Sequence, residues 1–124
     1  MLFRLTKFKP YDVYRYSQGA YVNGEWVKDN TPEVIPILAN IQPTKYSTVI
    51  QMPESDRTQK MCTVFTETVL REKKEGVNGY DGDKLYWQGD LYEIRRVRNW
   101  DINILNHIEA VGVRVELTPD EGEL

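Results

Sequence analysis

The stretch "GDKLYWQGDLYEIRRVRNW", Gly82–Trp100, says most about the fold of this chain. Polar and apolar residues alternate on both sides of a Gln88-Gly89-Asp90 turn. Alternation with a period of two is typical of a β-strand that buries one face, and a glycine between two such runs is typical of a hairpin turn. The stretch therefore predicts an antiparallel hairpin with four apolar positions toward a core: Leu85, Trp87, Tyr92 and Ile94.

A second tight hairpin is predicted near the N-terminus. Asn23-Gly24 readily adopts the positive φ angles of a two-residue turn, so Tyr21-Val22 should lie across from Glu25-Trp26. Prolines then interrupt the next apolar run at positions 32, 36 and 43. A proline inside a strand implies an edge or a bulge because it removes a backbone donor, and we expect a strand at about residues 37–42.

One short helix and two further strands are predicted in the rest of the chain. Tyr46, Val49 and Ile50 have helical spacing, and Pro53 should end the helix. The β-branched segment "MCTVFTETVL" (61–70) predicts a strand. The segment "VGVRVEL" alternates strictly and predicts a half-buried strand, preceded by a corner in "RNWDINILNHIEA".

Six to eight short strands with one brief helix predict an all-β fold, a small antiparallel β-barrel or sandwich with long loops. The 124 residues have the length of one ordinary domain. We expect a single domain over 1–124, with its core at about 11–117 and a frayed acidic tail at 118–124. The residues expected to anchor the core are Trp87, Tyr92, Val111, Val113 and Val115.

The balance of charged residues limits which kinds of partner the protein can bind. Sixteen basic and nineteen acidic residues give a net charge of -3, which argues against a protein that wraps duplex DNA by neutralising its phosphates. Cys62 is the single cysteine, so the chain has no internal disulfide and no cysteine-based metal cage. The N-terminus does not resemble a signal peptide, and no apolar stretch approaches the roughly 18 residues of a spanning helix. We expect a soluble, intracellular protein with no membrane contact.

The residues give little support for catalysis. His107 could act as a general base or metal ligand, but no second ligand type clusters near it, which favours an ordinary strand histidine. None of the three serines lies in a Gly-x-Ser-x-Gly setting, and the glycines lack the context of a phosphate-binding loop. We therefore expect no enzyme, no cofactor and no metal.

The segment "REKKEGVNGYDGD" (71–83) predicts a long polar loop or an extended hairpin. Asp81 and Asp83, or Glu67 and Glu72, could in principle serve acid/base chemistry or bind calcium. The pattern of a calcium loop is absent, so a solvated charged loop is favoured. Loops of this length in small domains are usually functional or disordered.

Two interpretations remain for the aromatic and basic residues of 82–100. In the first, Trp87 and Tyr92 supply core area while the arginines lie on the exposed side of the hairpin. In the second, bases stack on Trp87 or Tyr86 between arginines, as in a barrel that binds single-stranded nucleic acid. Interleaved acidic residues keep the local charge excess small, which favours the first interpretation: Asp90, Glu93 and Asp101.

The order of several short motifs carries a resemblance to a known family. "ANIQP" (Ala39–Pro43) precedes a short helix and the polar turn "PESDRT", and "VFTET" (Val64–Thr68) follows. "GDKLYWQGDLYEI" then fits the pattern Asp-x-hydrophobic-x-x-x-Gly-x-x-Tyr-x-hydrophobic. Over about residues 34–116, this order resembles the phage head-closure or head–tail connector proteins, also called head–tail adaptors or stoppers. These proteins join the portal complex of a filled capsid to the tail.

The resemblance implies a β-barrel-like fold assembled as a ring, expected to be a hexamer, in the neck or collar of the virion. The ring would lie between a portal or adaptor ring and the tail-terminator or tail-tube proteins, after assembly in the host cytoplasm. DNA would pass through the lumen without sequence-specific contact, and no catalysis is implied. A tail-completion or terminator ring is the nearest alternative.

Two sets of residues are candidates for the contacts of such a ring. The candidate channel or inter-ring loop comprises Arg71, Glu72, Lys73, Lys74, Glu75, Asn78, Tyr80, Asp81 and Asp83. The candidate subunit interface comprises Gln42, Arg57, Arg95, Arg96 and Arg98. The alternative for the loop is a solvated hairpin tip with no partner.

Overall fold

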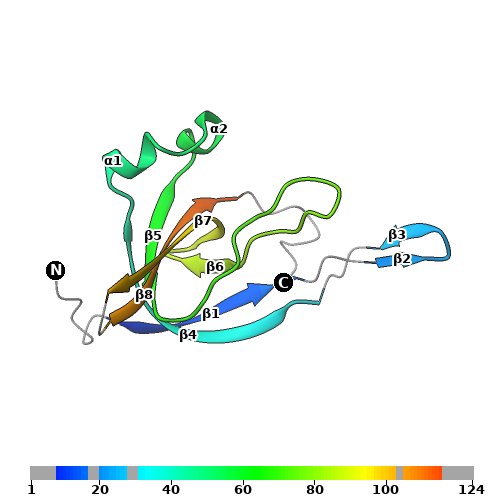
Figure 1. Ribbon diagram of the computed structural model, residues 1–124, viewed down its shortest axis with the longest axis horizontal. Coiled ribbons are helices and arrows are strands. Elements are labelled where there is room, and N and C mark those ends of the chain that lie inside the picture. Colours follow the sequence, from blue (N-terminus) through cyan, green and yellow to red (C-terminus); the bar gives the residue numbers. More distant parts are fainter. Residues whose placement is uncertain (1–7, 17–19, 28–30, 103–104, 116–124) are drawn as a thin grey trace.

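The strands of the computed structural model form a closed six-stranded antiparallel barrel in the order β1-β4-β5-β8-β7-β6, with β2 and β3 in a separate two-stranded sheet (Figure 1). The structure describes residues 8–16, 20–27, 31–102 and 105–115. The strands are β1 (Lys9–Arg15), β2 (Ala20–Val22), β3 (Glu25–Val27), β4 (Glu33–Pro43), β5 (Met61–Thr66), β6 (Lys84–Trp87), β7 (Asp90–Ile102) and β8 (Leu105–Arg114). The prediction of a small antiparallel all-β barrel is confirmed.

Both predicted tight hairpins are present. Tyr21 pairs with Trp26 across the β2–β3 turn, and Leu85 pairs with Tyr92 across the β6–β7 turn. The two central residues of each turn have positive φ: 54° and 83° at positions 23 and 24, and 49° and 84° at positions 88 and 89. These angles give the backbone the twist that a two-residue hairpin turn requires.

Two very short helices replace the single predicted helix. They are α1 (Tyr46–Val49) and α2 (Glu54–Arg57), and they lie between β4 and β5. The N–H groups of Asp56 and Arg57 both bond to the carbonyl of Pro53, so this proline begins a second helical turn after the first has ended. We call residues 44–60 the helix corner.

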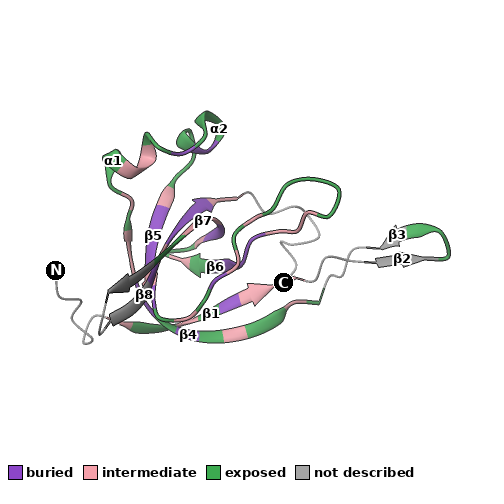
Figure 2. Ribbon diagram, in the orientation of Figure 1, coloured by how far each residue is buried: buried purple, intermediate pink, exposed green. Residues whose placement is uncertain are grey.

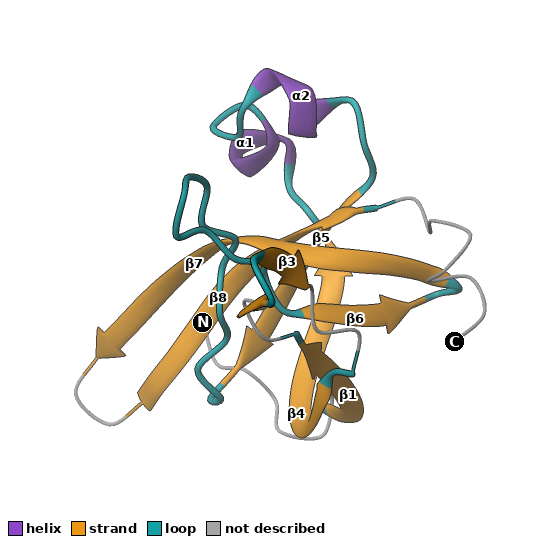
Figure 3. Ribbon diagram, turned by 90° about the vertical axis from the view of Figure 1, so that its right-hand side faces the viewer, coloured by secondary structure: helices purple, strands orange, loops and turns teal. Residues whose placement is uncertain are grey.

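The predicted corner in residues 98–110 is wrong. β7 and β8 continue as a paired ribbon, with Trp100 opposite His107 and Ile102 opposite Leu105, and the ribbon extends beyond the end of β5 (Figure 3). Apolar and polar residues alternate in the sequence from Trp100 to Ile104, and the alternation is interrupted at Leu105, so the sequence does not show that the two segments pair with each other.

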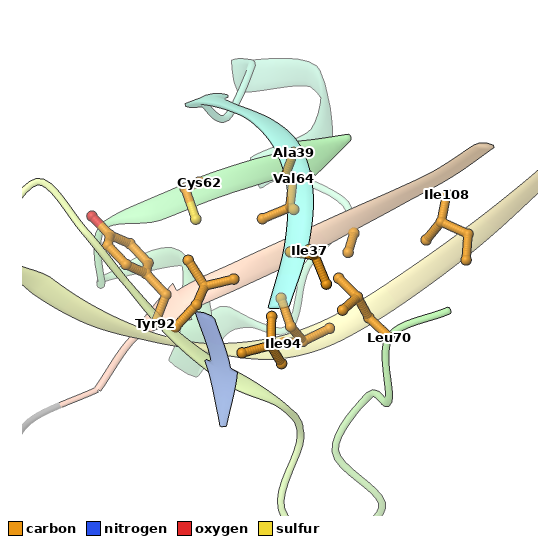
Figure 4. Packing of buried hydrophobic residues seen from close by; sticks show 11 residues of the cluster. Ile37, Ala39, Cys62, Val64, Leu70, Tyr92, Ile94 and Ile108 are labelled. Carbon is orange, nitrogen blue, oxygen red and sulfur yellow. The ribbon is translucent and has the colours of Figure 1, made fainter. Parts of the chain in front are cut away.

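The barrel interior is packed with side chains from every barrel strand (Figure 4). Val13, Leu85 and Ile94 have no exposed surface, which ties β1, β6 and β7 together where the barrel closes. Leu70 comes from the segment after β5 and joins this cluster near Ile37 and Ile108. Tyr92 is buried, as predicted for a core anchor.

From Ile108 to Val113, the strand β8 has buried residues on both faces. Val111 and Val113 are buried, as predicted, but they do not face the barrel interior: they pack with Met52 in a small second cluster under the helix corner. Ile108 and Ala110 belong to the interior cluster instead. Val115 was predicted as a core anchor and is only partly buried. The helix corner covers the outer face of β8, and the sequence alternation alone does not reveal this cover.

Trp87 was also predicted as a core anchor, and it is only partly buried. Its ring packs edge-on against Tyr92, with the ring centroids 5.9 Å apart. Substitution Trp87→Ala is therefore expected to lower the free energy of unfolding by about 2 kcal/mol, less than the roughly 3–5 kcal/mol of a fully buried aromatic. Urea unfolding measures this, and a loss above about 4 kcal/mol would contradict the partial burial.

β4 begins earlier than the predicted strand and has an open edge. Residues 33–38 pair only with β1 within the described part of the chain, because pairing with β5 starts at Ala39. The hydroxyl of Thr66 donates to the carbonyl of Leu38 at 2.8 Å, so the backbone at position 38 points away from β1. Pro36, two residues earlier, points the same way and presents no N–H at this edge. The expectation of a proline at an edge position is confirmed.

Candidate functional site

The 71–83 loop is an extended hairpin whose base is built into the barrel wall. The N–H of Lys73 donates to the carbonyl of Ile94 at 3.0 Å, and Lys74 pairs with Tyr80 in an antiparallel bridge. The Arg71 guanidinium lies over the Tyr80 ring, 4.7 Å from its centroid. Only the tip, residues 75–79, projects as a turn, and Val77 within it is fully exposed.

Asp83 closes the base of this loop and is completely buried. Its carboxylate accepts two bonds from the Arg15 guanidinium, from Nε and Nη2, each at 2.8 Å. It also accepts the backbone N–H of Arg71 at 2.8 Å. The hydrogen bond to Asp83 raises the pKa of Arg15. The placement of Asp83 among channel-facing loop residues is therefore wrong, because a carboxylate with no exposed surface cannot meet a partner ring.

A second ionic cluster joins the loop base to the helix corner. Glu93, which is buried, accepts the backbone N–H of Gly82 at 3.1 Å and Arg95 Nε at 2.6 Å. Arg95 Nη1 in turn donates to Asp56 Oδ1 at 2.7 Å. Arg95 occupies a bulge in β7, since the register with β8 shifts between Ile94 and Arg96. The bulge turns the guanidinium toward α2, where it links two carboxylates of the same chain.

The other residues of the predicted subunit interface are dispersed. Arg96 Nη1 donates to Gln51 Oε1 at 3.2 Å on the surface, and Arg57 Nε donates to the carbonyl of Met52 at 2.8 Å. Gln42 bonds to Asn40 at 3.1 Å on β4. Arg98 is exposed and lies opposite Glu109 in the β7–β8 ladder. The structure therefore does not gather these five residues into one patch.

A polar groove of about 550 Å³ brings part of both predicted sets together. It lies between the helix corner and the loop base, so loop and arginine side chains share its walls. Its lining is Gln51, Met52, Pro53, Ser55, Asp56, Glu72, Lys73, Glu75, Arg95 and Arg96. Charges of both signs line the groove, and such a surface suits a protein partner better than a polyphosphate chain, which selects for basic residues.

Arg95 and Arg96 are expected to behave differently when substituted. Arg95→Ala should lower the free energy of unfolding by about 2–3 kcal/mol, because it leaves two buried carboxylates without their cation. Arg96→Glu should leave the melting temperature of the monomer within about 2 °C of wild type, as for most surface substitutions, and should weaken association. Thermal unfolding at low concentration and sedimentation measure the two effects. Equal losses of melting temperature would contradict this division of roles.

The outside of the barrel carries an apolar surface that was not predicted from the sequence. On β4, Ile35, Ile37 and Ala39 face inward, whereas the alternate residues from 34 to 38 face outward and are exposed (Figure 2). The outer apolar face comprises Pro10, Tyr14, Val34, Pro36, Leu38 and Tyr86. Val34 is 51% exposed and Leu38 is 61% exposed. The unbroken apolar run of residues 34–39 could have predicted this surface, because an apolar run without alternation makes both faces of a strand apolar.

The helix corner carries a second exposed apolar surface. Tyr46 is 78% exposed and Ile50 is 51% exposed, and α1 contains no buried residue. Tyr46 and Ile50 have helical spacing in the sequence. The helix α1 is only four residues long, however, and neither side chain is buried against the barrel. Neighbouring Val49 is partly buried.

The metal-ligating side chains and the Cys62 thiol of the described residues bear on catalysis. None of their His, Cys, Asp and Glu side chains form a group of three or more that could hold a metal ion. Burial raises the pKa of the Cys62 thiol to about 12, so this sulfur stays protonated at neutral pH and is a poor nucleophile. The side chain of His107 lies outside the described residues. Among the helices described, none is long and apolar enough to cross a membrane.

No protein-family model matches this chain, and no curated protein matches it either.

Proposed function

We propose that this chain is a structural subunit of the neck of a tailed phage, where a ring of copies joins the portal or adaptor complex of the filled head to the tail and helps to close the channel. The observation that carries the proposal is the contrast between a filled barrel interior and two exposed apolar surfaces on the outside. A barrel filled by its own side chains leaves binding to its outer surfaces. Such a barrel suits assembly with other chains.

The motifs behind the resemblance to head–tail connectors occupy two pairs of adjacent strands in the barrel, β4–β5 and β6–β7. Ala39–Pro43 forms the end of β4 that pairs with β5, and Val64–Thr68 ends β5. The hairpin pattern begins at the buried Asp83 and includes Tyr92 and Ile94 of the interior cluster. Each conspicuous position of the pattern therefore has a structural role in closing the barrel, which supports the fold that the resemblance implies.

The tip of the 71–83 loop is the part of that loop available to another ring or to the channel. Lys74 is exposed immediately before the tip, and Glu75 and Asn78 are exposed within it. The adjacent opposite charges of Lys74 and Glu75 keep this end of the loop nearly neutral, which suits a surface along which DNA must slide, since a strongly basic surface would hold its phosphates.

Shortening the loop tests this role. Replacing residues 75–79 with an Asn-Gly turn should change the melting temperature by only a few degrees, because the Lys74–Tyr80 bridge and the Asp83 contacts remain. Phage with this variant should fail to assemble the neck or to retain DNA in the head. Normal infectious particles would contradict a role for the tip. Deleting all of residues 71–83 is the control, and it should unfold the protein because Asp83 is lost.

Capture from infected cells tests the proposed function itself. An affinity-tagged copy of the full chain should copurify with DNA-filled heads. Copurification with headless tails would instead assign the chain to tail completion. Copurification with neither, together with a salt-dependent shift of single-stranded oligonucleotides, would assign it to nucleic-acid binding.

A further inference from the structure

We infer that the outer apolar face of one copy docks on the helix corner of the next copy, so that the chain assembles head to tail. This inference deepens the proposed function and rests on it in one respect, since the proposed ring is what requires a repeated contact between copies. Leu38 lies at the centre of the outer apolar face, and Tyr46 lies at the centre of the apolar surface on the helix corner.

The first half of the contact is an apolar surface with an acidic border. Leu38 lies opposite Pro10 in the β1–β4 ladder, and Val34 lies opposite Tyr14, so both strands contribute to one face. Tyr86 extends this face, because its ring meets the Tyr14 ring edge-on with centroids 6.2 Å apart. Two exposed carboxylates border or interrupt it: Asp12 and Glu67. Exposed apolar area of this kind is typical of an interaction site.

The second half of the contact is an apolar surface with a mainly basic border. Tyr46 and Ile50 project from α1 and the turn that follows it. Lys45 and Arg57 are exposed beside them, and Arg96 contributes a partly exposed guanidinium through its bond to Gln51. Glu54 is the exposed acidic residue in this region. The border of the helix corner is therefore opposite in sign to that of the outer apolar face.

The arrangement of the two surfaces favours a head-to-tail contact. In both views the helix corner lies at the top, whereas β1 and the first part of β4, which carry the outer apolar face, lie at the bottom (Figures 1 and 3). Each copy can therefore offer one surface to each of two neighbours, and such contacts form rings when the rotation between copies closes. Pairing the outer apolar face with itself would bring Asp12 and Glu67 of both copies into one contact. Opposed like charges of this kind disfavour the symmetric dimer.

Sedimentation of the purified full-length chain and of two variants tests the contact. The wild type should assemble at high concentration, and Leu38→Asp and Tyr46→Asp should each sediment as monomers, with association constants lower on the order of tenfold to a hundredfold. Each variant retains the surface that the other has lost. An equimolar mixture of the two should therefore form one-to-one dimers that do not grow further. Because both positions are exposed, the melting temperature of each variant should stay close to that of wild type.

Val77→Asp is the matched control for the contact between neighbouring copies of one ring, because it places the same charge at a fully exposed apolar position in the loop tip, which the proposed function assigns to another ring or to the channel. It should assemble as the wild type does, and its dissociation to monomers would overturn the assignment of the two surfaces. A wild-type chain that stays monomeric at the highest soluble concentration would overturn the contact, as would variants that do not complement each other when mixed.

Failure of this contact can be told apart from failure of the proposed function. Assembly that depends on Leu38 and Tyr46, in a chain absent from the virion neck, would leave the contact standing and overturn the function. A ring in the neck that tolerates Leu38→Asp would leave the function standing and overturn the contact.

Discussion

Asp83→Asn is expected to lower the free energy of unfolding by about 3 kcal/mol. The substitution keeps the shape of the side chain but removes the charge that the Arg15 guanidinium meets through two bonds of 2.8 Å. It also presents an amide N–H₂ group where two donors now point, from Arg15 and from the backbone of Arg71. The Arg15 side chain is 29% exposed, so water solvates it in part, and the expected loss lies at the lower end of the range for a broken buried ion pair.

The matched control for Asp83→Asn is Asp81→Asn. Asp81 makes a looser ion pair with Lys84 at 3.6 Å and its side chain is 31% exposed, so its loss should amount to less than about 1 kcal/mol. Urea unfolding of both variants at neutral pH measures the difference. Equal losses would mean that the buried pair does not hold the barrel closed between β1 and the loop base.

Ile94→Ala is expected to lower the free energy of unfolding by about 4 kcal/mol. Ile94 has no exposed surface and lies in the middle of the interior cluster, so the shortened side chain leaves a cavity (Figure 4). Its backbone bonds to Asp83 and Lys73 resist movement of β7 into that cavity. A rigid site that cannot collapse loses more stability than a flexible one.

Ile50→Ala removes the same atoms from an exposed position and is the control. It should lower the stability of the monomer by less than about 1 kcal/mol. Chemical unfolding at a concentration too low for assembly measures both losses. A small loss for Ile94→Ala would mean that the interior is loosely packed, which would contradict the account of a filled barrel.

The hairpins were predictable because their signals are local. Asn23-Gly24 and Gln88-Gly89 set the turns, and the alternation around them placed Leu85 and Tyr92 in the core. The long-range contacts were not predictable in the same way. Arg15 and Asp83 are 68 positions apart, and nothing in either local sequence shows that they form a pair.

The candidate site was predicted less well for a related reason. Arg95 looks like one of three similar arginines, but a bulge in β7 turns it toward Asp56. Gly82 looks like a loop glycine, but a Cβ at that position would lie 2.0 Å from the carbonyl oxygen of Ile94, so the loop could not pack on β7 with a larger residue there. The outer apolar face depends on which strands stay uncovered, and that is a property of the whole barrel.

Electron microscopy of virions from a phage that carries this gene is the decisive test of the proposed place in the neck. The neck-subunit account predicts a ring of copies of this chain between the portal and the tail. Density for the chain at the tail end alone, or its absence from the virion, would contradict the account.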